Sequence, residues 1–578
     1  MQGLPSEPSP KWHFFIPKLY TVLREGYGIT DIRHDVIAGL TVAIVALPLS
    51  MALAVASGTT PERGLYTAIV AGFLISFFGG SRFQIGGPTG AFVVVVFNVI
   101  DAYGYDGLVQ ATLMAGVILI LFGVARFGTY IKYIPHPVVT GFTSGIALII
   151  FSSQIKDLLG LTIDKVPAGF LEKWVVYGQH LGSVQIPTAL IAGLSLVLII
   201  GLRRFAPKLP GFLIAIALGS AAVWLLGMPV DTIGSRFGGI PHSLPTPSWP
   251  VWSVDRSVEL LPSAITIAFL AGVESLLSAV VADGMTGRRH RSNCELMAQG
   301  IANIASAVFG GIPATGAIAR TATNIRSGGR SPVAGMAHAV FLLLFILFLS
   351  PLASYVPLAS LGAVLVIVAW NMSEIDQFRH LMLAPVGDRL VLLLTFGLTV
   401  LVDLTLAIEV GVVLAAILFM HRMSELVEVQ TRTQLIADDI DDLAVPLPEP
   451  YAPLDDLPDS INVYQIDGPF FFGAATRLGD ILTRISRPSE VFILRMRHVP
   501  MVDATGAAAL IAFITRCHGH GTTVILCNLQ AQPRQVIERM GNGASGYRVE
   551  IVENFAAARR RALAIVRPAP DQSDSAHR

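Results

Sequence analysis

The 578-residue sequence is short of charge, because only 14% of its residues are Asp, Glu, Lys or Arg. Soluble proteins carry roughly a quarter charged residues, whereas here 53% are hydrophobic and the mean hydropathy is +0.64. Most of the chain is therefore expected to lie in a lipid bilayer. The net charge is zero, which gives no reason to expect nucleic acid as a partner.

Short chemical motifs are also missing. The three cysteines, Cys294, Cys517 and Cys527, have no metal-ligand spacing and do not indicate disulfides. There is no GxxxxGK[ST] phosphate-binding loop, no GxSxG nucleophile elbow and no HExxH pair. The residues before Asp35 contain no short apolar region with a small-residue cleavage site, so no cleaved signal peptide is predicted. We therefore expect neither an enzyme nor a cofactor or metal.

Apolar stretches that suit membrane helices recur fourteen times in the sequence. Because seven spans separate equivalent positions, and seven is odd, the second set is inserted upside down relative to the first. The fold class predicted is an α-helical polytopic membrane protein with inverted repeats at 36–227 and 258–421. The individual spans are 36–56, 63–78, 88–101, 107–123, 137–156, 187–201, 210–227, 258–282, 294–309, 316–325, 332–350, 357–371, 388–401 and 404–421.

An even number of spans places both termini on one side, and the Lys and Arg residues of the loops select that side. The loops that share the side of the termini contain Arg126, Lys132, Arg203, Arg204, Lys208, the GRRHR stretch at 287–291 and Arg379. The opposite loops hold fewer basic residues, such as Lys165, Lys173, Arg236 and Arg256. This asymmetry predicts that the N-terminal segment 1–35 and the C-terminus are both cytoplasmic.

Two stretches interrupt the apolar pattern in the same way, FGGSRFQIGGPTGAF (78–92) and FGGIPATGAIARTATN (309–324). They mark equivalent third helices of the two repeats, and short Gly/Pro-interrupted spans are typical of transporter binding sites. Two helices that begin in mid-membrane would direct their N-termini at each other and bind an anion. The predicted substrate-binding residues are Thr89, Gly90, Ala91, Thr315, Gly316, Ala317, Ile318, Ala319 and Arg320. The alternative is that Gly and Pro only allow close helix packing.

Roles differ within that set. Thr89 and Thr315 would cap the half-helices or donate to the ligand. Arg320 lies one turn into its half-helix, where it would contact the anion or serve as a cytoplasm-facing anchor. Glu274 stands in an otherwise apolar span, and such carboxylates are usually functional. We predict that Glu274 takes up and releases a proton, hydrogen-bonded to Ser278 one turn later; the alternative is a permanently protonated side chain that joins two helices.

The character of the chain changes after about His421. The stretch 437–460 is acidic and Pro-rich, which is typical of a linker or exposed loop. Buried strands predicted at 461–468, 491–496 and 523–529 alternate with helical patterns and indicate a cytoplasmic α/β domain at 461–566. The helical patterns cover 473–486, 506–518, 532–540 and 554–566. The tail 567–578 is predicted to be disordered.

These residues resemble the SulP family of anion transporters, relatives of the vertebrate anion exchangers and prestin, and most closely the DauA-type bacterial C4-dicarboxylic acid transporters. The resemblance includes a C-terminal STAS domain matching 461–566. It rests on LPLSMALAVASG (47–58), GGSRFQIGGPTGAFVVV (79–95), VESLLSAVVADGMTG (273–287), ATGAIARTATNIRSGG (314–329) and VAWNMSE (368–374).

The resemblance implies a core domain that holds the anion, a gate domain, elevator-like movement between them, and a homodimer in the bacterial inner membrane. It places anion binding at the amides of Thr89–Ala91 and Gly316–Arg320, and the coupling carboxylate at Glu274. Sulfate-type members often have Gln after the first-span proline, whereas here Leu49 follows Pro48. Sodium-dependent bicarbonate members favour Asp at the position of Glu274 and a hydroxyl near Ile318, whose side chain has no oxygen.

In the STAS segment, MVDATGAAAL (501–510) resembles the phosphorylated loop of anti-sigma-factor antagonists. Asp503 and Gly506 fit, but Ala504 occupies a position where those proteins often have Ser. Thr505 is then either a modification site or the N-cap of a helix.

The function predicted is proton-coupled uptake of C4-dicarboxylates such as succinate, fumarate or aspartate. Bicarbonate or sulfate transport, sodium-coupled if Ile318 is misleading, is the alternative within the family. A passive anion channel, or a scaffold whose STAS domain recruits a cytosolic protein, is the alternative outside it.

Overall fold

A computed structural model gives the fold in two compact units, residues 1–415 and 416–578. It describes residues 15–131, 135–163, 166–207, 209–249, 252–425, 428–431, 457–458, 460–471, 490–544 and 550–566. Lys132, Lys165, Lys208, the helix predicted at 473–486, nearly all of the linker at 437–460 and the tail at 567–578 lie outside these residues. The two units are described separately below.

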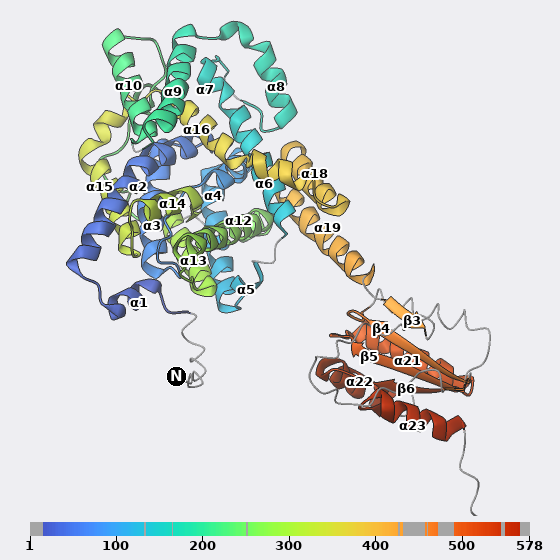
Figure 1. The fold of residues 1–578 in the computed structure, drawn as a ribbon. Coiled ribbons are helices and arrows are strands. Elements are labelled where there is room, and N and C mark those ends of the chain that lie inside the picture. The colour runs from blue at the N-terminus through green and yellow to red at the C-terminus, as the bar shows by residue number, and fades with distance from the viewer. Residues whose placement is uncertain are drawn as a thin grey trace, which may run out of the picture. The chain divides into compact units, whose positions relative to one another are not determined.

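The first unit is a bundle of helices (Figure 1). Among the described residues, eight helices are long and apolar enough to cross a membrane, and shorter helices complete the predicted spans. The segment predicted as the first repeat contains α2 (Ile29–Ala56), α3 (Pro61–Phe78), α4 (Val93–Val124), α6 (His136–Ser153), α9 (Ile186–Phe205) and α10 (Gly211–Leu226). The second contains α12 (Val254–Thr286), α13 (Ser292–Val308), α14 (Ile318–Arg326), α15 (Val333–Ala353), α16 (Leu358–Met372), α18 (Val386–Leu401) and α19 (Leu404–Glu425).

The element α4 covers most of the two spans predicted at 88–101 and 107–123, and a non-helical break separates them inside it, as the prediction has it. The junction is a kink at Gly104, whose φ of 72° and ψ of 179° are not helical. A left-handed φ favours glycine, since the Cβ of any other residue clashes with the backbone there. The third and fourth spans therefore form two segments of one bent element.

Short helices connect the spans. They are α1 (Lys18–Glu25), α5 (Gly128–Ile131), α7 (Ile155–Leu159), α8 (Phe170–Gln179), α11 (Ile233–Phe237), α17 (Ile375–Leu381) and the 3-10 turns η2 (Gly90–Phe92) and η3 (Leu181–Ser183).

The helix α2 begins at Ile29, inside the segment predicted to precede the first span. Its buried Asp35 accepts hydrogen bonds from the Arg330 amide at 2.6 Å, from the Tyr27 hydroxyl at 2.7 Å and from the Ser331 hydroxyl. The start of α2 is thereby tied to the start of α15.

The second unit contains a five-stranded sheet in the order β3-β4-β5-β6-β7. Its strands are β3 (Glu428–Thr431), β4 (Ile461–Asp467), β5 (Val491–His498), β6 (Thr523–Cys527) and β7 (Glu550–Val552). The β3–β4 pair is antiparallel and the other neighbours are parallel. The helices α21 (Ala504–Gly519), α22 (Ala531–Ala544) and α23 (Phe555–Val566) follow the later strands. The edge strands β3 and β7 are absent from the sequence prediction.

The loop before α21 corrects another prediction. The N-cap of α21 is Asp503, whose Oδ1 accepts a hydrogen bond from the Gly506 amide at 2.6 Å. Thr505 is already inside the helix, so it is not the N-cap. An Asp side chain satisfies one of the four amides left unpaired at a helix start, and here Asp503 does so two residues earlier than predicted.

Candidate functional site

The two interrupted stretches meet. Residues Gly86–Gly87 form β1 and Thr315–Gly316 form β2, and the two pair antiparallel, with Gly86 opposite Gly316 and Gly87 opposite Thr315. The Ala317 amide also donates to the Ile85 carbonyl at 2.9 Å. Segments about 230 residues apart are therefore joined directly before each half-helix begins.

Each half-helix starts with amides that have no acceptor in the described part of the chain. On the first side these are Gly90 and Ala91, which open η2 and then α4; on the second they are Ile318, Ala319 and Arg320, which open α14. Neither helix start has a side-chain cap. The predicted capping by Thr89 and Thr315 is therefore wrong. Unpaired N–H groups at a helix start carry partial positive charge and bind anions.

The two threonines instead form hydrogen bonds to α12. Thr89 Oγ1 donates to Glu274 Oε2 at 2.8 Å, and Thr315 Oγ1 donates to the Ala271 carbonyl at 2.8 Å. Since one threonine comes from each repeat, α12 links both half-helices. Glu274 is half-buried, while Thr315 is fully buried. The carboxyl of Glu274 thus belongs to the place where the half-helices meet.

Ser278 does not contact Glu274, contrary to the prediction. Its hydroxyl donates to Thr321 Oγ1 at 3.1 Å, and the same oxygen accepts from the Ile85 amide at 3.1 Å. Ser278 therefore stabilises the packing of α12 on α14. The hydrogen bond to Glu274 on which its predicted role in proton coupling depended is not formed.

Arg320 is buried rather than facing the cytoplasm, with only 2% of its surface exposed. Its Nη2 donates to Ser50 Oγ at 3.2 Å and to the Pro88 carbonyl at 3.1 Å. Its Nε and Nη1 have no partner among the described residues. No ion pair with Glu274 is found in this part of the chain, although the two charges are close enough to interact. Arg320 thus places a positive charge directly behind the half-helices.

Two glycines at the site pack closely against neighbouring side chains, which would have to move if a Cβ were added. A Cβ on Gly90 would lie 2.5 Å from Met372 Sδ and 3.2 Å from Ile150 Cδ1, so the first half-helix touches α16 and α6. A Cβ on Gly316 would lie 1.7 Å from Gln84 Nε2. The site is therefore bounded on one side by helices other than those that carry it.

A group of hydrogen-bonded polar residues that the sequence prediction did not select lies beside the crossing, the place where the two half-helices meet. Gln84 Nε2 donates to Ser275 Oγ at 2.6 Å, and Ser275 Oγ donates to Glu295 Oε1 at 3.2 Å. The fully buried Glu295 also accepts from the Gly80 amide at 2.8 Å and from Gln299 Nε2 at 2.9 Å. Glu295 could have been selected from the sequence, because a carboxylate inside the predicted span at 294–309 is as unusual as Glu274.

Other charged residues lie apart from the site. Asp283, beside the GRRHR loop, is hydrogen-bonded to His290, with 2.7 Å between Oδ2 and Nδ1. Glu409 is exposed on α19. Within the described residues no group of His, Cys, Asp or Glu side chains is arranged to bind a metal ion.

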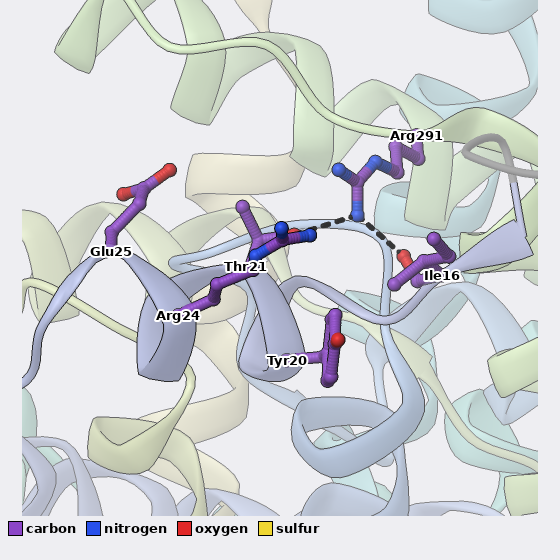
Figure 2. A pocket seen from close by; sticks show the side chains of 6 residues that line it. All are labelled: Ile16, Tyr20, Thr21, Arg24, Glu25 and Arg291. Atoms are coloured by element: carbon purple, nitrogen blue, oxygen red, sulfur yellow. Dashed lines mark hydrogen bonds between the residues drawn. The ribbon is translucent and has the colours of Figure 1, made fainter. Parts of the chain in front are cut away.

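A surface pocket of about 410 Å³ lies beside α1 and is also separate from the site (Figure 2). Arg291 Nη1 donates there to the Ile16 carbonyl at 2.6 Å and to Thr21 Oγ1 at 2.9 Å. Burial and the nearby Arg82 charge lower the pKa of Arg291, which precedes α13. This pocket contains none of the predicted site residues, and its bonds attach α1 to the α12–α13 loop.

Comparisons with known proteins agree with this architecture. Residues 32–395 match the Sulfate permease family and residues 454–556 match the STAS domain. The YvdB protein of Bacillus subtilis (strain 168) is 42% identical over 519 residues, covering 89% of this chain and 95% of that protein. The Bicarbonate transporter BicA of Picosynechococcus sp. (strain ATCC 27264 / PCC 7002 / PR-6) is 31% identical over 528 residues, covering 88% and 91%.

A solved structure shows the same fold. The murine Slc26a9 anion transporter in its inward-facing state superimposes with a TM-score of 0.84 at 19% identity, covering 98% of this chain and 96% of that one. The predicted fold class, a helical membrane transporter with a C-terminal STAS domain, is confirmed. The matched segments, the paired half-helices and the STAS sheet together show that the chain belongs to the sulfate permease family of membrane transporters.

Proposed function

We propose that the protein carries a small oxyanion across the bacterial inner membrane, with both termini in the cytoplasm, and that protons drive the uptake. The observation that carries this proposal is the set of unpartnered amides of Gly90, Ala91, Ile318, Ala319 and Arg320, which come from two half-helices joined at β1 and β2. Two such helix starts supply partial positive charge from the backbone alone. The nearby Arg320 guanidinium adds a full positive charge. Since Arg320 forms no ion pair with a carboxylate among the described residues, an anion would not have to displace one.

Glu274 supports proton coupling through charge. An ionised carboxylate at the half-helix junction repels an arriving anion, whereas the protonated form does not. Binding of the proton and binding of the anion therefore favour each other, and this coupling is reciprocal. Thr89 belongs to the anion-binding stretch and donates to Glu274 Oε2 at 2.8 Å, so it connects the two binding events.

The substrate class is a small anion with oxygen atoms that accept several N–H donors. The resemblance to C4-dicarboxylate transporters puts succinate, fumarate and aspartate first from the sequence. The Sulfate permease family and the relative BicA carry the names of sulfate and bicarbonate, so these two anions are equal candidates. Elevator-like movement of a core domain against a gate domain, in a homodimer, is proposed with the transport cycle, and a cytosolic partner for the STAS domain is proposed alongside it.

The test is uptake into proteoliposomes that contain the purified full-length protein. Labelled succinate, fumarate, sulfate and bicarbonate are offered separately, each with an inward proton gradient, an inward sodium gradient or neither. We expect proton-driven accumulation of one or more of these anions. Glu274→Gln should abolish accumulation against a gradient but leave anion exchange, while Glu409→Gln, the same change on the exposed face of α19, should behave as wild type.

Each other outcome overturns a defined part of the proposal. Sodium-driven uptake would replace the proton as the coupling ion. Anion flux that Glu274→Gln leaves intact and that never exceeds the gradient would indicate a passive channel. Loss of cellular function after removal of residues 440–578, with normal transport, would favour a scaffold whose STAS domain recruits a partner.

The site itself is tested by Ala317→Leu. Ala317 is 8% exposed and directly precedes the unpartnered amide of Ile318, so a leucine there would fill the space against the backbone. We expect anion binding, measured by calorimetry or by ligand-dependent thermal stabilisation, to be lost. Ala416→Leu at an exposed position of α19 is the control, and unchanged affinity in Ala317→Leu would remove the half-helix junction as the anion site.

A further inference from the structure

The connecting helix α8 has two unlike faces. Leu171, Trp174 and Val175 are 66%, 41% and 60% exposed, whereas Lys173 and Tyr177 are 4% and 2% exposed. Lys173 and Tyr177 are four residues apart, so they lie on one side of the helix, one turn from each other. An apolar outer face with an aromatic side chain suits a helix that lies at a membrane surface, and its polar groups then point into the protein.

Both inward side chains lack partners. Lys173 Nζ lies 6.0 Å from the centroid of the Phe97 ring, and no carboxylate or hydrogen-bond acceptor contacts it in the described part of the chain. The Tyr177 hydroxyl is buried and has no hydrogen-bond partner there either. Burial lowers the pKa of Lys173. The Tyr177 hydroxyl is fully buried, and the Lys173 ammonium lies on a side chain that is 4% exposed. A largely buried cation without an ion pair and a buried hydroxyl without a hydrogen bond are both unfavourable, and an anion that bound both groups would lower that cost.

The Asp157 carboxylate acts electrostatically on Tyr177, but it is already engaged by an arginine, and the basic residues Lys156 and Arg63 have partners of their own. Asp157 binds Arg236 at 2.9 Å, Lys156 donates to the Ile163 carbonyl, and Arg63 donates to the Gly310 carbonyl at 3.4 Å. Among the basic residues predicted on this side, Lys173 therefore combines burial with the absence of an ion pair, whereas Arg256 is exposed.

The position of Lys173 relative to the anion site follows from its contact with Phe97. Phe97 lies on α4 eight residues after Thr89, which is about 12 Å along a helix that rises 1.5 Å per residue. It packs against the loop that follows α2, since a Cβ on Gly58 would lie 3.1 Å from its ring. Lys173 is therefore next to the half-helix that opens at Gly90, about midway between Thr89 and the kink at Gly104.

We propose that Lys173 and Tyr177 form a second, transient anion subsite that receives the oxyanion from the outer side before it reaches the half-helix junction. This rests on the proposed function and its orientation. The ammonium supplies the charge and the Tyr177 hydroxyl a second donor, and the Phe97 ring faces the ammonium when no anion is bound. Such a subsite would raise the rate at which external anions are captured, with little effect on later steps of the cycle.

The test measures initial rates in right-side-out vesicles that contain the full chain, against the external concentration of whichever of succinate, sulfate or bicarbonate the wild type carries. Lys173→Gln should raise KM for external anion about tenfold, the weight of one charge-assisted hydrogen bond, and should leave kcat nearly unchanged. Tyr177→Phe, which removes only the hydroxyl, should raise KM less. The difference between Lys173→Gln and wild type should shrink at high salt.

Controls separate a subsite from a structural role. Lys173→Arg should keep the wild-type KM, and Arg256→Gln should not change it. An unchanged KM in Lys173→Gln would overturn the subsite, as would a loss of kcat that Lys173→Arg shares. Wild-type vesicles that carry none of the anions would overturn the proposed function itself, a result distinct from a normal wild type with an unaffected variant.

Discussion

The crossing of the two half-helices can be tested by adding a single methyl group at Gly316. A Cβ built there lies 1.7 Å from Gln84 Nε2, 2.4 Å from Gln84 Cδ and 3.0 Å from Gln84 Cγ. The whole Gln84 side chain would have to move in Gly316→Ala, because no single bond rotation of the amide clears three of its atoms. Gln84 would then lose its 2.6 Å hydrogen bond to Ser275.

The expected cost has two parts. Overpacking a well-filled interior costs about 1–3 kcal/mol, and leaving a buried polar group unpaired costs about 1–3 kcal/mol. Some relaxation is shared between them, so we expect about 2–4 kcal/mol in total. If the strain appears as a displaced Thr315–Ala317 backbone, anion affinity should fall roughly 30-fold to several hundredfold, since each 1.4 kcal/mol is a factor of ten.

The assay combines thermal unfolding of the purified protein with anion binding, for Gly316→Ala, Gln84→Ala and the double variant. Gln84→Ala removes the obstructing side chain, so adding Gly316→Ala to it should cost much less than adding it to wild type, which is a measurable coupling between the two positions. Gly397→Ala in α18 is the matched control, because a Cβ there meets nothing within 4 Å. A normal melting temperature and normal affinity in Gly316→Ala would refute the reasoning, and so would additive effects in the double variant.

The remaining predictions concern other parts of the chain. Asp503→Ala should lower the stability of the STAS domain by about 1 kcal/mol, because it removes an N-cap, whereas Thr505→Ala should have a smaller effect; hydrogen exchange of α21 in the full chain would show the difference, and equal effects would contradict it. Asp35→Asn should lower the melting temperature more than Asp31→Asn, because Asp35 is buried among several donors while Asp31 forms an exposed pair with an arginine. Gly104→Ala should destabilise by about 1 kcal/mol, since its φ is left-handed, and a thermal melt at or above the wild-type temperature would show that the kink tolerates a side chain.

Much of the architecture could be predicted from the sequence because lipid imposes a simple rule. A span that faces lipid must be apolar and must satisfy its own backbone, so the spans, and the two buried interruptions between them, are visible as composition. Gly104 shows the limit of that rule, since a kink and a loop both break an apolar run. The short edge strands β3 and β7 were missed because strands of four and three residues offer little periodicity.

The detailed bonding of the site was less predictable. Periodicity along α12 correctly puts Glu274 and Ser278 one turn apart, but it does not say which neighbouring helix each side chain meets. Ser278 hydrogen-bonds to Thr321, and Glu274 to Thr89, because the pairing depends on how α14 and the first half-helix cross α12. Thr315 could equally have capped its own helix by local rules, and the tertiary contact with the Ala271 carbonyl prevailed.

The pairing of Gly86 with Gly316 also sets a schedule for biosynthesis. The second partner is made about 230 residues after the first, and at about 5–20 residues per second that delay is roughly 10–50 s on the ribosome. During this interval the half-formed crossing lacks β2, Thr321 and Arg320, so the Ile85 amide and the carbonyls of Ile85 and Pro88 have no native partner. These groups must remain hydrated or be held by the insertion machinery. A nascent chain stopped before residue 315 would therefore display a polar break in the membrane, which quality-control proteases could distinguish from the completed transporter.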